Sequence, residues 1–133
     1  MTSSSAAEPF ATSIAPWLAV ERAQEAVDFY QAAFGAVVSY RLEDDNGKLV
    51  VARLAINGAA FWVQEDSGAS PETVATGSVR LILAVEDPDS VFAHAIASGA
   101  VMVKPMGEEY GWRTGRVTDP SGHGWEISRQ LTP

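Results

Sequence analysis

Few side chains of this 133-residue chain have the type and spacing that catalysis requires. The sequence has no cysteine, which excludes a thiolate nucleophile, a disulfide and a cysteine metal site. Of its two histidines, His94 falls outside the apolar stripe of a predicted helix and His123 follows a turn. We expect His94 to be solvated and His123 to bond to backbone. Without a nucleophile-base pair, a phosphate loop or paired catalytic carboxylates, the sequence predicts no catalytic residue.

A glycine-punctuated segment, GEEYGWRTG over residues 107–115, concentrates charged and aromatic side chains. Tyr110, Trp112 and Arg113 are expected to lie in a loop that glycines at 107, 111 and 115 allow to move. This loop is a candidate lid over a binding site. The alternative is a connector whose aromatic side chains cover a sheet edge or a dimer interface. The acidic run Glu43–Asp45 is expected to be a solvated hairpin tip.

These side chains must be positioned by a unit that occurs twice. AVERAQEAVDFYQAAFGAV at residues 19–37 returns in outline as AVEDPDSVFAHAIASGAV at residues 84–101. Val20 corresponds to Val85 and Gly35 to Gly99. A repeat of this length indicates a duplicated module, and a duplicated module favours a functional site at the join between the copies.

Hydrophobic periodicity predicts the order β-α-β-β-β in each copy. Gly35 and Gly99 are placed to end the two helices, and Asp87 followed by Pro88 is a typical start for the second. The predicted first-module elements are strands 13–20, 36–43, 48–56 and 59–65 around helix 21–34. The second module has strands 79–85, 100–105, 113–118 and 124–129, with a helix from residue 88 and a turn at 119–122. We therefore divide one compact domain into a flexible tail (1–12), a module (13–66), a polar linker (67–77) and a second module (78–133).

Composition narrows the choice of partners. The chain is 47% hydrophobic and 20% charged, and no apolar run reaches the length of a membrane span. Nine basic and seventeen acidic residues give a net charge of −8, which disfavours nucleic acid and anionic lipid. The first residues lack the basic and apolar pattern of a signal peptide. A cytoplasmic protein without nucleic-acid or membrane partners is expected.

The doubled βαβββ unit with the ending TGRVTDPSGHGWEI resembles the vicinal oxygen chelate superfamily of glyoxalases, bleomycin-resistance proteins and extradiol dioxygenases. WLAVERAQEAVDFYQAAFGA and YGWRTGRVTDPSGHGWEIS are similar to its PhnB-like branch. The resemblance implies an α+β fold in which eight mostly antiparallel strands form a cupped sheet, in a homodimer. It also implies that enzymes of the superfamily hold a divalent metal through one ligand on each of four strands, with histidine and glutamate typical.

Matching the two copies assigns those four ligand positions to Ala15, Trp62, Arg80 and Glu126. Only Glu126 is a usual ligand for a divalent metal, whereas a catalytic site takes three or more protein ligands. A permanently charged arginine would repel the cation. The sequence therefore predicts neither metal nor other cofactor. The alternative is a metal site assembled from other residues, such as Gln64, His123 and Glu126.

Strand alternation predicts which side chains face the cup. The alternating positions predicted to face the cup carry the side chains Trp17, Trp62, Gln64, Arg80 and Glu126 among small residues. The other parity gives an apolar set suited to lie beneath the helices, namely Leu18, Val20, Phe61, Val63, Leu81, Leu83, Val85, Trp125 and Ile127. An apolar pocket with few polar groups is typical of small-molecule sites. The prediction is a metal-free cup that binds a planar or aromatic molecule carrying a charged group.

Other interpretations stay open at this point. Arg80 and Glu126 could be partners in a structural ion pair. Trp17 and Trp62 could fill the cup and leave no cavity. The functional alternatives are a metal-dependent lyase, isomerase or dioxygenase with unusual ligands, and an interaction module without a small ligand.

Overall fold

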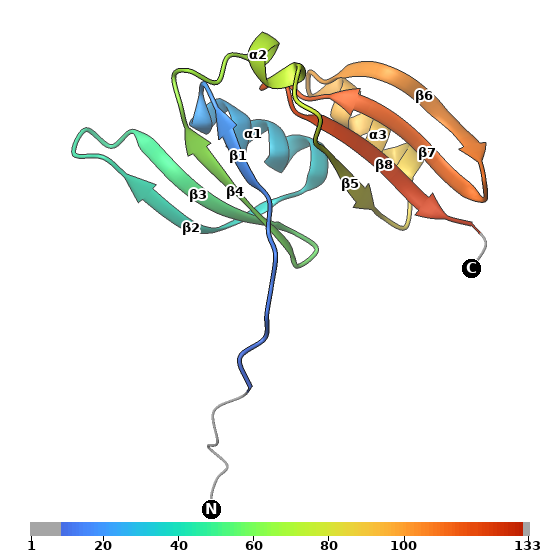
Figure 1. Cartoon of the computed structure of the whole chain (residues 1–133), viewed down its shortest axis with the longest axis horizontal. Coiled ribbons are helices and arrows are strands. Elements are labelled where there is room, and N and C mark those ends of the chain that lie inside the picture. Colours follow the sequence, from blue (N-terminus) through green and yellow to red (C-terminus); the bar gives the residue numbers. More distant parts are fainter. Residues whose placement is uncertain (1–8, 132–133) are drawn as a thin grey trace, which may run out of the picture.

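The computed structural model describes residues 9–131 and contains the βαβββ unit twice (Figure 1). The first module comprises β1 (Trp17–Val20), α1 (Ala23–Phe34), β2 (Val37–Glu43), β3 (Leu49–Ile56) and β4 (Ala59–Glu65). A short helix, α2 (Pro71–Ala75), lies between the modules. The second module comprises β5 (Arg80–Ala84), α3 (Pro88–Ala97), β6 (Val101–Glu109), β7 (Trp112–Thr118) and β8 (Gly124–Gln130). The predicted α+β fold of two tandem modules is confirmed.

The eight strands form two four-stranded sheets rather than one continuous sheet. Their orders are β1-β4-β3-β2 and β5-β8-β7-β6, and only the β1–β4 and β5–β8 pairs are parallel. The equivalent strands β1 and β5 are edge strands that lie on either side of the join, while α1 and α3 pack against each other behind the sheets (Figure 1). The open face of each sheet is therefore turned to the same side of the molecule.

The helix ends follow the sequence signals. Gly35 has a left-handed φ of 67°, and its amide donates to the Gln31 carbonyl, which closes α1. At the start of α3, the Asp87 side chain accepts from the Ser90 amide at 3.2 Å, and Pro88 occupies the first turn. Both predicted boundaries are confirmed.

The predicted parity of the strands is confirmed by burial. On the helix-facing parity, Leu81 and Val85 are half-buried and all the others are buried: Leu18, Val20, Phe61, Val63, Leu83, Trp125 and Ile127. Aromatic side chains continue this core across the join, with the Trp125 ring 4.7 Å from that of Phe34 and 5.6 Å from that of Tyr30. One aromatic core thus holds the two modules together.

Two local predictions differ from the structure. The predicted linker contains α2, because the Ser70 side chain accepts from the Thr73 amide and Pro71 fits the first helical turn. β1 begins at Trp17 instead of residue 13, since Pro16 has no amide hydrogen and joins the ladder only through its carbonyl, which accepts from Trp62 N. Residues 1–8 of the predicted tail lie outside the described residues. No helix within residues 9–131 is long and apolar enough to cross a membrane.

Candidate functional site

The open face of the first sheet carries an aromatic platform, the cross-strand row Trp17, Trp62, Arg53 and Tyr40. The indoles of Trp17 and Trp62 are stacked, with ring centroids 5.8 Å apart and planes 24° apart. The Tyr40 ring meets Trp62 edge-on at 5.9 Å, and the Arg53 guanidinium lies 5.9 Å from the Trp62 centroid. These are attractive geometries for aromatic and cation-π contacts, so neighbours on both sides hold Trp62 in place.

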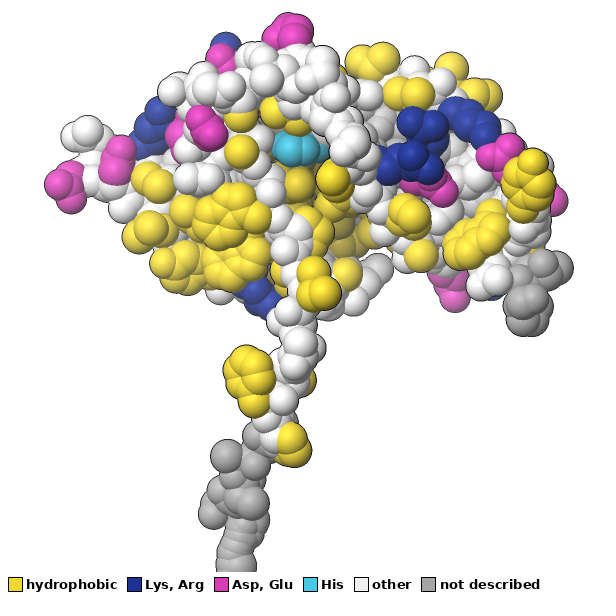
Figure 2. Space-filling view, viewed as in Figure 1, with side chains coloured by type: hydrophobic (Ala, Val, Ile, Leu, Met, Phe, Trp, Pro, Cys, Tyr) yellow, Lys and Arg dark blue, Asp and Glu magenta, His cyan; other side chains and the backbone are white. Residues whose placement is uncertain are grey.

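The platform is open to solvent. Trp17 is 53% exposed and Tyr40 46% exposed. The Trp17 Nε1 donates to Gln64 Oε1 at 2.9 Å, which fixes the indole in its stacked position. Within one chain, the two tryptophans therefore do not fill the cup. Figure 2 shows hydrophobic side chains gathered over this sheet, while lysine and arginine side chains gather over the other.

The open face of the second sheet carries an ion pair. Arg80 Nε donates to Glu126 Oε1 at 3.0 Å, and their side chains are 49% and 19% exposed. An exposed pair of this kind contributes little to stability, on the order of 0–1 kcal/mol. The ion pair matters for metal binding, because it places a permanent positive charge against Glu126. Glu126 is the one carboxylate among the four predicted metal-ligand positions. The predicted contact between the two residues is present.

A groove of about 530 Å³ runs between the edge strands β1 and β5. It is lined by residues 14–18 on one side and 79–82 on the other. Trp17 and Arg80 therefore line one groove, whereas Trp62, Gln64 and Glu126 flank it from the neighbouring strands. The structure thus places one first-module and one second-module member of the predicted set, Trp17 and Arg80, in the same groove.

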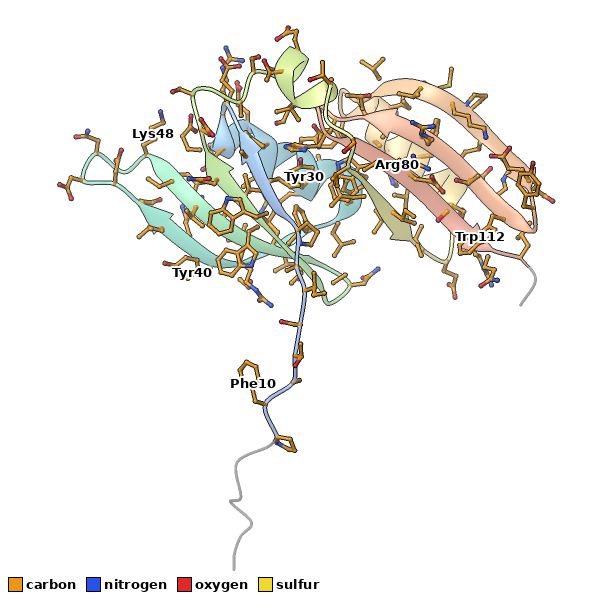
Figure 3. The ribbon with its side chains drawn as sticks, viewed as in Figure 1. Phe10, Tyr30, Tyr40, Lys48, Arg80 and Trp112 are labelled. Carbon is orange, nitrogen blue, oxygen red and sulfur yellow. The ribbon has the colours of Figure 1, made fainter. Side chains whose placement is uncertain are left out.

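The segment GEEYGWRTG is a β-hairpin, which corrects the predicted loop. β6 continues to Glu109 and β7 begins at Trp112, so the turn consists of Tyr110 and Gly111 alone. Both have positive φ, 52° and 81°, as a type I′ hairpin turn requires. Tyr110 is 99% exposed at the tip, and Figure 3 shows Trp112 well apart from Arg80.

Arg113 lies on the other face of this hairpin from Trp112. Its guanidinium forms two hydrogen bonds with the Asp89 carboxylate of α3, at 2.9 and 2.6 Å. These bonds raise the pKa of Arg113 and lower the pKa of Asp89. Arg113 thus connects β7 to α3 on the helix side, and within one chain neither it nor Tyr110 nor Trp112 reaches the groove.

The two histidines occupy the expected kinds of place. His94 is exposed on α3. A ring nitrogen of His123, Nε2, lies 2.9 Å from the Ala19 carbonyl oxygen, so His123 bonds to backbone across the join between the modules. This hydrogen bond gives His123 a structural role at the join.

A buried carboxylate at the join was missed by the sequence analysis. Asp119 Oδ2 accepts from the Tyr30 hydroxyl at 2.5 Å and from Trp125 Nε1 at 2.8 Å, while Oδ1 accepts from the amides of Ser121 and His123. Burial, followed by the adjacent Asp119 charge, raises the pKa of Tyr30 well above its ordinary value. The sequence recognised this aspartate only as the first residue of a turn. Its four donors make it the polar centre of the core that joins the modules.

Three further side chains on the open faces were also missed. Tyr40 and Arg53 complete the aromatic platform, and Arg116 lies opposite Glu126 on β7. The signal that could have found them is the same alternation that was applied to β1, β4, β5 and β8, extended to the other four strands.

Two βαβββ modules, joined by their helices and presenting a groove between equivalent edge strands, define a paired-module α+β protein. The chain matches the Glyoxalase/Bleomycin resistance protein/Dioxygenase superfamily over residues 11–127 and belongs to it.

The chain is also similar to several known proteins. The chain is 34% identical over 126 residues to the uncharacterized protein Rv0887c of Mycobacterium tuberculosis, covering 89% of this chain and 74% of that protein. It is similar to the crystal structure of TioX from Micromonospora sp. ML1, with 28% identity, a TM-score of 0.70, and coverage of 92% of this chain and 98% of that one. The fosfomycin resistance protein FosX from Listeria monocytogenes shares the fold, with 18% identity, a TM-score of 0.71 and coverage of 93% and 95%.

The residues present do not fit the divalent metal that the resemblance implied for enzymes of this superfamily. Glu126 is bound by Arg80, and the described residues contain no group of three or more histidine, cysteine, aspartate or glutamate side chains suited to a metal. The alternative ligands are engaged elsewhere, since Gln64 accepts from Trp17 and His123 bonds to Ala19.

Proposed function

We propose that this protein binds a small planar or aromatic molecule, without a metal, in the groove between β1 and β5. The observation that supports this is the open, stacked pair Trp17 and Trp62 beside the cation Arg80. Exposed indoles bury apolar area and stack when a flat ring lies against them, which is worth about 0.5–1.5 kcal/mol beyond the area term. The guanidinium supplies the polar contact that would orient a charged ligand.

The platform is held in its binding conformation before a ligand arrives. Gln64 accepts the Trp17 indole hydrogen at 2.9 Å, and Arg53 and Tyr40 contact Trp62 from the next strands. Fixed side chains lose little rotamer freedom on binding, so more of the contact energy appears as affinity. The groove is suited to recognition and holding of a ligand, and its residues supply no nucleophile.

We further propose that the protein works as a homodimer. Large apolar side chains at the groove are exposed in one chain, including Ile14, Val79 and Ile82. A second copy laid over this face would cover them and close the groove. Tyr110 and Trp112 would contribute to a binding cup only through such a second copy, because neither lines the groove of its own chain.

The test uses 2-naphthoate as a fused-ring probe in calorimetric titrations. Trp17→Ala should weaken binding about tenfold, since losing about 1.4 kcal/mol of stacking and area corresponds to that factor. Trp17→Phe, which keeps a smaller ring, should fall between. Phe10→Ala is the matched control, because Phe10 is an exposed aromatic residue of the chain that does not line the groove. Equal affinity for wild type and Trp17→Ala would rule out the platform as the binding surface.

A further inference from the structure

The open face of the second sheet is basic although the chain carries a net charge of −8. Glu126 on β8, Arg116 on β7 and Lys104 on β6 form one cross-strand row, and Arg80 reaches the same row from β5. Two of the three cations have carboxylate partners, Arg80 with Glu126 and Lys104 with Glu109. Arg116 forms no ion pair within residues 9–131.

Arg116 is in an unfavourable place for an unpaired cation. Its direct cross-strand partner on one side is Lys104, and like charges opposite each other destabilise a sheet. Its partner on the other side, Glu126, is engaged by Arg80 at 3.0 Å. Local conflicts of this kind are typical of functional positions, where a ligand supplies the missing charge.

Arg80 and Arg116 both line a pocket of about 270 Å³. Thr118 and Gly124 line it from the strand ends, and part of the connection between α2 and β5 closes it above. Gly122, which also lines the pocket, has a φ of 96° and packs against Pro71 at the start of α2. A Cβ at residue 122 would lie 2.3 Å from the Pro71 carbonyl oxygen, so only glycine lets the 119–122 turn pack this closely under α2.

Arg80 lines both this pocket and the 530 Å³ groove that contains Trp17. A ligand could therefore place its flat ring against the platform and its polar group between the two guanidinium groups. Two guanidinium charges and the Glu126 carboxylate leave a net of one positive charge (+2 − 1 = +1) at this point. The balance favours a singly charged anion.

We propose that this pocket is an anion subsite and that the ligand is a planar or aromatic monoanion, such as a carboxylate. Arg116 is the principal partner of the anionic group, and Arg80 connects it to the groove. Arginine suits this role because its planar fork of donors matches a carboxylate and stays charged at all working pH values. The placement of the ring rests on the proposed function, whereas the anion subsite does not.

The subsite is tested by comparing 2-naphthoate with 2-naphthylmethylammonium, which has the same ring and the opposite charge. Wild-type protein should bind the carboxylate at least about tenfold more tightly, a modest value for one charge-assisted hydrogen-bond pair. Arg116→Gln should abolish that preference. Arg22→Gln is the matched control, since it removes the same charge from an exposed position at the start of α1. Equal binding of both probes, unchanged in Arg116→Gln, would overturn the subsite and leave the platform standing.

A second readout separates the subsite from the platform. Inorganic phosphate, which contains no ring, is titrated at a pH where it is mainly a monoanion, and the arginine Nε–Hε resonances are followed by NMR. We expect saturable shifts of the Arg80 and Arg116 signals, absent for Arg22. No shift at these two arginines would refute the subsite whatever the naphthalene probes do. Phosphate binding without binding of either naphthalene probe would instead refute the platform.

Discussion

The join between the modules depends on the buried carboxylate of Asp119, and Tyr30→Phe tests this dependence. The substitution removes one hydroxyl from a fully buried side chain and leaves Asp119 Oδ2 with Trp125 as its remaining side-chain donor. A buried hydrogen bond to a charged group is worth about 1.5–3 kcal/mol, so we expect a loss of about 2 kcal/mol in the free energy of unfolding. With roughly 2.1 cal/mol/K per residue over 133 residues, the unfolding entropy is roughly 0.28 kcal/mol/K, and Tm should fall by about 7 °C.

Urea unfolding followed by circular dichroism measures this loss, and Tyr40→Phe is its control. Tyr40 is a half-exposed tyrosine on the open sheet face, so losing its hydroxyl should change stability by no more than about 0.5 kcal/mol. If Tyr30→Phe were as stable as Tyr40→Phe, the role of Asp119 in joining the modules would be refuted.

The raised pKa of Tyr30 adds a pH signature. Above pH 10.0, the ordinary pKa of a tyrosine, the unfolded chain loses the phenol proton while the folded chain keeps it. The folded state then binds more protons, so this contribution to stability falls as pH rises. The difference between wild type and Tyr30→Phe should therefore shrink above pH 10. A difference that stays constant or grows in that range would contradict the assignment.

Two further predictions concern stability and assembly. Ser128 is fully buried, and its hydroxyl has no hydrogen-bond partner among the described residues. Urea unfolding of Ser128→Ala should therefore show unchanged stability or a gain of up to about 1 kcal/mol. A loss of more than about 1 kcal/mol would indicate a partner for that hydroxyl. Sedimentation equilibrium of the wild-type protein should give a dimer. Charged substitutions at Ile14 and Ile82 should shift the monomer–dimer equilibrium toward monomer, because both side chains are exposed at the groove in one chain. A wild-type monomer at micromolar concentration would refute the proposed assembly.

The alternation of side chains along each strand supplied most of the correct predictions. It assigned the helix-facing set correctly because a strand has a period of two and these modules bury one face of each sheet. Trp17 lies directly opposite Trp62 in the register, whereas Arg80, which lies opposite Gly124, reaches Glu126 diagonally because both side chains lie on the same face. The repeat could not show that β1 and β5 stay unpaired edges, because the angle between modules depends on packing of α1 against α3.

The misses have separate physical causes. The hairpin at Tyr110 and Gly111 looked like a mobile loop because its glycines suggested freedom, whereas positive φ at both residues closes a tight turn. Asp119 looked like an ordinary turn residue because its partner Tyr30 lies 89 positions away in the chain. Such long-range partners leave no local pattern, and only the folded arrangement of the modules reveals them.

Calorimetric titration of 2-naphthoate into protein dialysed against EDTA, with and without added zinc, tests the central claim most directly. A metal-free groove predicts binding of the same affinity in both conditions, weakened by Trp17→Ala and by Arg116→Gln. Binding that appears only after zinc is added, with stoichiometric metal that Glu126→Gln abolishes, would contradict the account and return the protein to the metal-dependent enzymes of its superfamily.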